Sequence, residues 1–200
     1  APPSYEALAD LNLLQVFLFG IYPYIALVVA ILGSWARFDL SQYSWKTSSS
    51  QMLQPKYMRI GSNLFHIGII TVLLGHLFGM LTPHFIYENF ISAAHKQILA
   101  VVVGGIAGVV CWFGMVLLMI RRFTDPRISN TSTFSDKLVL ILLFIQLNLG
   151  LLSIFTSMKH LDGATMMNLA GWAQDITMLR PWQAAARINQ ADLIYQIHIL

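Results

Sequence analysis

The sequence predicts an all-α integral membrane protein, and two observations lead to this fold class. Hydrophobic residues make up 56% of the 200 residues, whereas Asp, Glu, Lys and Arg make up only 10%, against about 25% in an ordinary soluble domain. Four long segments also contain no Asp, Glu, Lys or Arg: residues 11–36, 60–87, 97–120 and 138–158. Each exceeds the roughly 20 residues that a helix needs to cross a bilayer. A β-barrel would instead show alternating segments of about ten residues.

The first two predicted spans have clear boundaries. The first, at about 11–36, follows the polar lead APPSYEALAD. It is too long for a secretory signal peptide and lacks the basic n-region of one. The second, at about 60–82, ends where Thr82 and Pro83 introduce a helix breaker, because proline cannot continue the backbone hydrogen-bond ladder.

The remaining spans complete the predicted bundle. The third covers about 97–120 and the fourth about 138–158, with the connection "DPR" breaking the helix after the third. A fifth apolar run begins near residue 193, and the sequence stops inside it at Leu200. About eight apolar residues cannot cross a bilayer. We therefore expect one membrane domain over residues 1–200, a five-helix bundle whose fifth helix is truncated here.

Basic residues in the connections predict the topology. The first connection holds Arg37, Lys46, Lys56 and Arg59, the second only Lys96, and the third Arg121, Arg122, Arg127 and Lys137. Cytoplasmic loops carry an excess of Lys and Arg, so the first and third connections are expected inside and the N-terminus outside. The fourth connection is nearly neutral. The net charge of +3 is thus a topology signal and does not indicate nucleic-acid binding.

The fourth connection contains a predicted helix of its own. In ATMMNLAGWAQDITML, residues 164–179, apolar side chains recur at helical spacing. An interfacial amphipathic helix with Trp172 near the lipid headgroups would have this pattern. An ordinary packed loop helix would have it too, and the pattern leaves both interpretations open.

Several chemistries are excluded by the sequence. Cys111 is the only cysteine, so the chain has no disulfide framework, no iron–sulfur or zinc cluster site, and no C-x-x-C-H motif for covalent haem. Glycine-rich nucleotide-binding motifs are also absent. The segment GGIAG, residues 104–108, has the small-residue spacing of close helix packing in membranes.

Histidines inside the second span are the strongest functional signal. His66 and His76 are separated by ten residues, which is about 15 Å of rise and about 80° short of full turns, so they share one side of the helix. A glycine stripe at residues 61, 68, 75 and 79 runs beside them. Such a stripe lets a helix or a flat macrocycle approach the backbone.

A haem would solve the burial cost of these histidines. His198 is expected at a depth comparable with His76, and two histidines from facing helices can hold one haem iron. Hydrogen bonding between helices is the alternative for an intramembrane histidine, and spacing alone leaves it open. His84, His95 and His160 are interpreted as interfacial residues.

A resemblance to a known family rests on eight segments. They are IYPYIA, GSWARFDLSQYSW, SSSQML, SNLFHIGI, GHLFGMLTPH, KQILA, HLDGATMM and GWAQ. In this order they are similar to the gamma subunit of respiratory nitrate reductase, from about Phe17 to Leu200. The resemblance implies a five-helix cytochrome b with two non-covalent haem b groups in the bacterial inner membrane, its N-terminus periplasmic. It implies quinol oxidation in anaerobic respiration, with electrons passing from the outer to the inner haem. They then reach a cytoplasmic iron–sulfur (beta) subunit and a molybdenum (alpha) subunit, which reduces nitrate.

The resemblance also implies particular roles. His76 and His198 would ligate the outer haem, and His66 one side of the inner haem. The second inner ligand would lie beyond Leu200 on the fifth helix, and we expect a histidine about 15 to 20 residues after His198. Lys96 and Gly75 would border the quinol site beside the outer haem.

Other interpretations remain open beside these. Lys96 could equally be an interfacial lysine whose side chain extends toward the headgroups and has no catalytic role. Arg37, Arg121 and Arg122 are interpreted, by charge complementarity, as partners of inner-haem propionates. The same sequence features would also be expected of a related haem b subunit of another molybdenum or sulfur-cycle complex, or of a haem-free membrane anchor or transporter.

Overall fold

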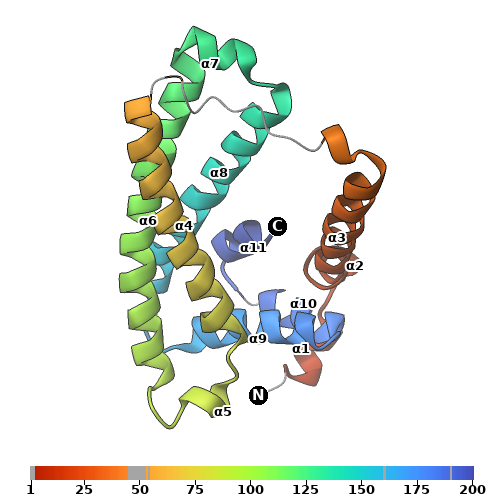
Figure 1. Ribbon diagram of the computed structural model, residues 1–200. Helices are drawn as coiled ribbons and strands as arrows, with labels where there is room; N and C mark the ends of the chain where they lie inside the picture. The colour runs from red at the N-terminus through yellow and green to blue at the C-terminus, as the bar shows by residue number, and fades with distance from the viewer. Residues whose placement is uncertain (1–2, 45–52, 54, 160, 190) are drawn as a thin grey trace. The chain divides into compact units, whose positions relative to one another are not determined.

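A computed structural model describes residues 3–44, 53, 55–159, 161–189 and 191–200 (Figure 1). Regular structure in these residues is entirely helical. The α-helices are α1 (Tyr5–Ala9), α2 (Leu13–Val16), α3 (Tyr22–Leu40), α4 (Pro55–Leu81), α5 (His84–Tyr87), α6 (Ala93–Thr124), α7 (Pro126–Thr131), α8 (Phe134–Ser157), α9 (Ala164–Thr177), α10 (Pro181–Asn189) and α11 (Leu193–Ile199). A π-helix, η1 (Phe17–Ile21), joins α2 to α3, and a 3-10 turn, η2 (Gln42–Ser44), follows α3.

Four helical segments are long and apolar enough to cross a membrane: Leu13–Leu40, Tyr57–Leu81, Ala93–Thr124 and Phe134–Ser157. They confirm the all-α membrane class and the four complete spans predicted from the sequence. The fifth span stays a prediction, since α11 has seven residues in this chain. Lys46 and His160 lie outside the described residues.

Helix ends differ from the predicted span ends at several basic residues. Arg37 lies inside α3, Lys96 lies in the first turn of α6, and Arg121 with Arg122 lies in its last turn. Lysine and arginine are good helix formers, and their long side chains can reach the interface from a helical backbone. The uncharged segments therefore mark the apolar part of each span, and they underestimate the length of the helix.

The chain divides into two compact units. The terminal unit comprises α1–α3, the segment Met80–Ala93 and α9–α11, whereas the central unit comprises α4 up to Gly79 and the segment Ala94–Leu161. The prediction of a single domain stays a prediction.

In the terminal unit, the first span contains a π-helical irregularity, and a side chain of α9 forms a hydrogen bond with its backbone. In an α-helix the amide of residue 23 would donate to the carbonyl of Phe19, but Pro23 has no N–H. The Tyr22 N–H bonds the Phe17 carbonyl in the π-helical pattern. The indole Nε1–H of Trp172 donates to the Phe19 carbonyl at 2.9 Å. Trp172 thus satisfies a backbone acceptor that proline leaves without its usual donor.

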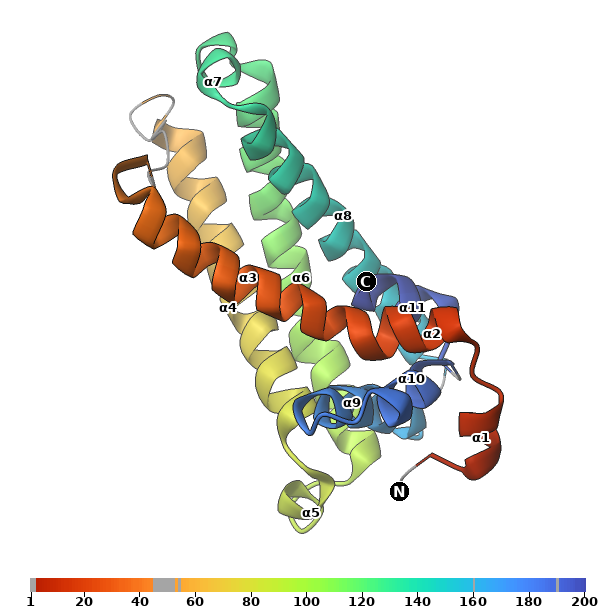
Figure 2. The ribbon, with the colours of Figure 1, turned by 90° about the vertical axis from the view of Figure 1, so that its right-hand side faces the viewer.

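The π-helix also lets α10 approach the first span closely. A Cβ at Gly20 would lie 2.5 Å from the carbonyl oxygen of Pro181, so only glycine fits there. Val16 and Phe19 form a core with Ala185 and Ile188 of α10. Figure 2 shows α9 and α10 beside the N-terminal end of this span.

Helix α9 is a packed helix with polar ties to its neighbours. The hydroxyl of Tyr24 donates to the Ile176 carbonyl at 2.8 Å, and Gln174 Nε2 donates to the Met80 carbonyl at 2.9 Å. Because the Trp172 indole is also used inside the protein, the structure favours the packed-helix interpretation over the one that placed Trp172 among headgroups.

A buried ion pair joins α9 to α10. Arg187 Nε lies 2.6 Å from Asp175 Oδ2, with both side chains largely buried. The guanidinium passes over Gly171, where a Cβ would lie 2.5 Å from Arg187 Cζ. A charge at this depth is tolerable because its partner neutralises it, so α9 and α10 are coupled as one hairpin.

In the central unit, half of the glycine stripe packs a helix. A Cβ at Gly68 would lie 2.5 Å from the Cys111 amide nitrogen and 2.6 Å from the Ala107 carbonyl oxygen, so α4 and α6 touch backbone to backbone. At Gly75 and Gly79 a Cβ would meet no described atom within 4 Å. The stripe therefore divides into a helix-packing half and an open half.

Polar residues join α6 to α8. Trp112 Nε1 donates to Asn148 Oδ1 at 3.3 Å, and Gln97 Nε2 donates to the Ser157 carbonyl at 3.0 Å. The expected small-residue packing holds at Gly108, where a Cβ would lie 2.7 Å from Leu151 Cδ2.

Candidate functional site: the intramembrane histidines

The two histidines of α4 have the same local hydrogen bond. His66 Nδ1 lies 2.7 Å from the Ser62 carbonyl oxygen, and His76 Nδ1 lies 2.8 Å from the Val72 carbonyl oxygen. A carbonyl oxygen can only accept, so Nδ1 carries the proton in both rings. The neutral tautomer then has its lone pair on Nε2, the atom that an axial haem ligand presents to iron.

This bond also fixes the orientation of each ring. A ligating histidine commonly donates its second ring N–H to a backbone carbonyl, and that bond holds the ring plane and raises the basicity of the ligand nitrogen. Both rings are exposed on the surface of the chain. Gly75 and Gly79, which flank His76, add no side chain beside it. The residues present therefore fit haem ligation at both positions.

His198 lies in α11, and hydrogen bonds to the end of α10 and the following turn fix the start of this helix. Gln196 Nε2 donates to the Ala191 carbonyl at 2.9 Å and to the Ile188 carbonyl at 3.3 Å, and Tyr195 is buried. His198 itself is half-buried. It belongs to the terminal unit, whereas His66 and His76 belong to the central unit, so the pairing of His198 with His76 stays a prediction.

The histidines form no polydentate metal site among the described residues, where no three His, Cys, Asp or Glu side chains converge. A zinc-type centre needs three or four such ligands, whereas a haem needs only one axial nitrogen from each face. The described donor set therefore suits haem better than a protein-only metal centre.

The predicted quinol residues lie on separate helices of the central unit. Lys96 is half-buried in the first turn of α6, and Gly75 precedes His76 on α4. The structure assigns neither of them a substrate, so their role stays a prediction.

Of the three arginines considered for propionates, two already bond the protein. Arg121 is only 3% exposed, and its Nη2 donates to the Leu53 carbonyl at 2.7 Å. Arg122 Nη1 donates to Ser132 Oγ at 2.9 Å. Arg37 is exposed in the last turn of α3. Arg121 and Arg122 therefore stabilise the turns at the ends of α4 and α6. Propionate binding by the three arginines stays a prediction.

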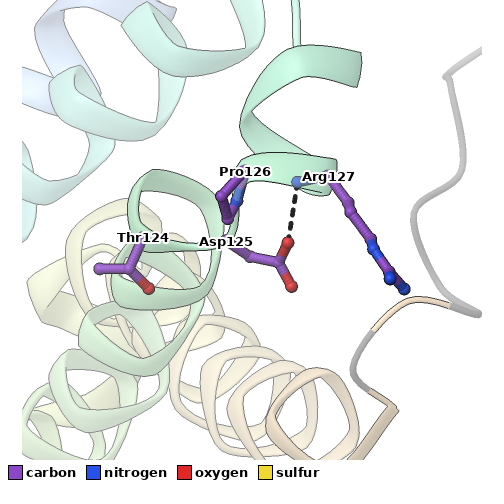
Figure 3. A pocket seen from close by; sticks show the side chains of 4 residues that line it. All are labelled: Thr124, Asp125, Pro126 and Arg127. Carbon is purple, nitrogen blue, oxygen red and sulfur yellow. Dashed lines mark hydrogen bonds between the residues drawn. The ribbon is translucent and has the colours of Figure 1, made fainter.

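A shallow concavity that the sequence did not indicate lies at the turn between α6 and α7 (Figure 3). It is lined by Thr124, Asp125, Pro126 and Arg127. Asp125 Oδ1 accepts the Arg127 backbone N–H at 2.9 Å, which caps the short α7. Asp125 and Arg127 are the ionisable side chains of this lining, and we assign the concavity no chemistry.

The spans and their helical connections define a multi-pass, all-α membrane protein. The family model described as "Nitrate reductase gamma subunit" matches residues 15–200. The chain therefore belongs to the nitrate reductase gamma subunit family, as its sequence segments indicated. It is a membrane subunit of a nitrate reductase, an oxidoreductase complex of the electron-transport type.

Individual relatives agree with this assignment. The chain is 46% identical to the respiratory nitrate reductase 1 gamma chain of Escherichia coli over 190 residues, covering 95% of this chain and 84% of that one. It is 46% identical to the E. coli respiratory nitrate reductase 2 gamma chain, covering 94% of this chain and 82% of the relative. It is 33% identical to the Bacillus subtilis nitrate reductase gamma chain, covering 92% and 82%.

Proposed function

We propose that this chain is the dihaem cytochrome b subunit of a respiratory nitrate reductase, which oxidises quinol near the periplasmic face of the inner membrane. The observation that carries the proposal is the Nδ1–H bond of His66 and of His76 to a carbonyl one turn earlier, which leaves Nε2 as the ligand atom. Family membership supports it.

Four ligand positions are needed for two haems. We assign His76 and His198 to the outer haem, and His66 to the inner haem together with a ligand outside this sequence. When bound, the two haem b groups supply one-electron acceptors at two depths. The Ser62 and Val72 carbonyls accept from Nδ1 and orient both α4 rings, so that Nε2 would be the atom that holds the iron of each haem.

Quinol would be bound by Lys96 in this proposal. An ammonium at the start of α6 can donate to a quinol oxygen and stabilise negative charge as the quinol proton leaves. Gly75 leaves the backbone of α4 open to a flat ring beside His76. With the N-terminus periplasmic, as the basic connections predict, Lys96 stands on the outer side and the quinol protons are released there.

Electrons would leave on the opposite side of the membrane. Moving each charge inward against the membrane potential costs about 2.3 kcal/mol per 100 mV, which the redox reaction with nitrate must supply. We propose a cytoplasmic iron–sulfur (beta) subunit as the acceptor and a molybdenum (alpha) subunit as the site of nitrate reduction, so this chain does not itself reduce nitrate. Arg37, Arg121 and Arg122 are proposed to face the inner haem propionates.

Haem content tests this proposal directly. A reduced-minus-oxidised spectrum of the purified complex, combined with a haem assay, should show two haem b per copy of this chain. Both should become reduced when a quinol is added. Absence of haem from a complex that still contains all its subunits would contradict the proposal and favour a haem-free membrane anchor.

A further inference from the structure

The turn between α9 and α10 is strained at an exposed leucine. Leu179 has φ 58°, in the left-handed region that favours glycine. The Arg180 N–H bonds the Asp175 carbonyl at 2.8 Å, and the Leu179 N–H bonds the Ile176 carbonyl at 3.1 Å. These bonds make a Schellman ending of α9, in which glycine usually takes the left-handed position. A leucine side chain is kept there although it is 76% exposed.

Other large apolar side chains are exposed beside it. Met178 is 55% exposed and Trp182 is 54% exposed, and the exposed Arg180 lies between them in sequence. We call residues 178–182 the apolar turn. The rest of α10 is different, since Ala184, Ala185 and Ile188 are buried, so the hairpin has already covered its inner face.

Contacts within the terminal unit set the depth of the apolar turn. The Pro181 carbonyl touches Gly20, and α9 bonds the Phe19 carbonyl through Trp172. Gly20 lies seven residues, or roughly 10 Å, from the start of the Leu13–Leu40 span. That span is about 42 Å long, and a hydrocarbon core of about 30 Å leaves roughly 6 Å at each end. Gly20 is therefore roughly 4 Å on the acyl-chain side of the border with the headgroups, so the apolar turn that touches it lies close to that border.

We propose that the apolar turn is a membrane-interface anchor that inserts into the lipid leaflet at the N-terminal end of the first span. Met178 and Leu179 enter the acyl chains, Trp182 lies at the headgroup border, and Arg180 pairs with a lipid phosphate. Tryptophan prefers this depth because its ring is apolar and its N–H is polar. Arginine recognises phosphate through paired N–H donors.

Lipid is the occupant that these observations favour. A turn in water would be relieved by glycine at position 179, whereas a lipid-facing turn gains from each apolar side chain that it inserts. The cation of Arg180 also complements a phosphate and has no counterpart in an apolar protein surface. The apolar turn belongs to the terminal unit alone, and its depth does not depend on the haem and quinol assignments.

Photo-crosslinking in the assembled complex tests the anchor. The photoreactive residue p-benzoylphenylalanine replaces Trp182, and whole cells are irradiated before the complex is purified and this chain is analysed by mass spectrometry. We expect a phospholipid adduct at position 182. The same residue in place of Tyr5, which is 93% exposed on α1, is the matched control and should give no lipid adduct.

The other outcomes would overturn the proposal. An adduct with another subunit or with another helix of this chain would show that protein covers the turn, and no adduct would show that it faces water. A second measurement uses the conservative Trp182→Phe variant. Tryptophan fluorescence is measured for the wild type and for the variant in vesicles of phosphatidylethanolamine and phosphatidylglycerol with brominated acyl chains. The difference between the two spectra is the emission of Trp182, and the bromine should quench it. Unquenched emission would again contradict insertion.

Discussion

Single hydrogen bonds decide which nitrogen each α4 histidine offers. Because the bonds at Ser62 and Val72 run along the helix, they depend only on the helical backbone and would form wherever histidine takes this rotamer. Sequence spacing could predict that His66 and His76 share a side, but not the tautomer, which depends on the rotamer.

The role of His76 as a haem ligand can be tested by substitution. His76→Ala should remove the outer haem and abolish quinol oxidation, because the methyl group of alanine cannot ligate iron. Haem quantification per chain is the measurement. His84→Ala is the matched control: His84 pairs with Glu88 at 2.6 Å in the exposed α5 region and should be dispensable for both haems. Full haem content in His76→Ala would contradict the ligand assignment.

Lys96 can be separated from haem binding. In Lys96→Ala, stopped-flow measurement of haem reduction by quinol should show at least about a tenfold slower rate, the cost of a lost charge-assisted hydrogen bond of roughly 1.5 kcal/mol or more. Both haems should remain. Unchanged kinetics would return Lys96 to the role of an interfacial lysine.

The bond between Trp172 and Phe19 can be tested with proline chemistry. Trp172→Phe leaves the Phe19 carbonyl without its donor and should destabilise the protein by about 1–3 kcal/mol. In the Pro23→Ala background, a new backbone N–H is available to the same carbonyl, so the cost of Trp172→Phe should fall. Chemical denaturation of the four variants in detergent measures this coupling. Equal costs in both backgrounds would show that the carbonyl is not the shared acceptor.

At the scale of elements, close helix packing separates glycines that look alike in sequence. Gly68 and Gly104 both lie inside apolar helices, yet only Gly68 meets a neighbouring backbone. A hydrophobic stripe cannot distinguish them, since lipid and a neighbouring helix are equally apolar. Which half of the α4 stripe touches α6 therefore had to come from the structure.

This difference predicts opposite effects of one substitution. Gly68→Ala should destabilise the α4–α6 pair by about 1–3 kcal/mol, because the added methyl overlaps backbone atoms that cannot move independently. Gly104→Ala should be neutral or stabilising by up to about 1 kcal/mol, since a Cβ there meets no described atom within 4 Å and alanine favours the helix. Thermal unfolding of both variants measures the contrast, which equal shifts would refute.

At the scale of the whole molecule, topology is the property that the basic connections predict. Tyr5, at the N-terminal end, and Tyr43, after α3, are 93% and 95% exposed and stand at opposite ends of the first span. Cysteine in place of Tyr5 should react in intact spheroplasts with a membrane-impermeant maleimide. Cysteine in place of Tyr43 should react only after lysis. The reverse pattern would place the N-terminus in the cytoplasm.

The sequence by itself determined the class of this protein, its four complete spans and its candidate ligand histidines. Those features are local: a span is a matter of length and apolarity, and two histidines on one helix have a fixed rotation between them. The tertiary structure decided that α9 packs by Trp172 onto the carbonyl freed by Pro23, that only part of the glycine stripe holds a helix, and that Leu179 and Trp182 remain outside. These contacts join residues far apart in the chain. In an apolar solvent the hydrophobic pattern does not mark which face of a helix turns inward, so geometry alone selects the partners.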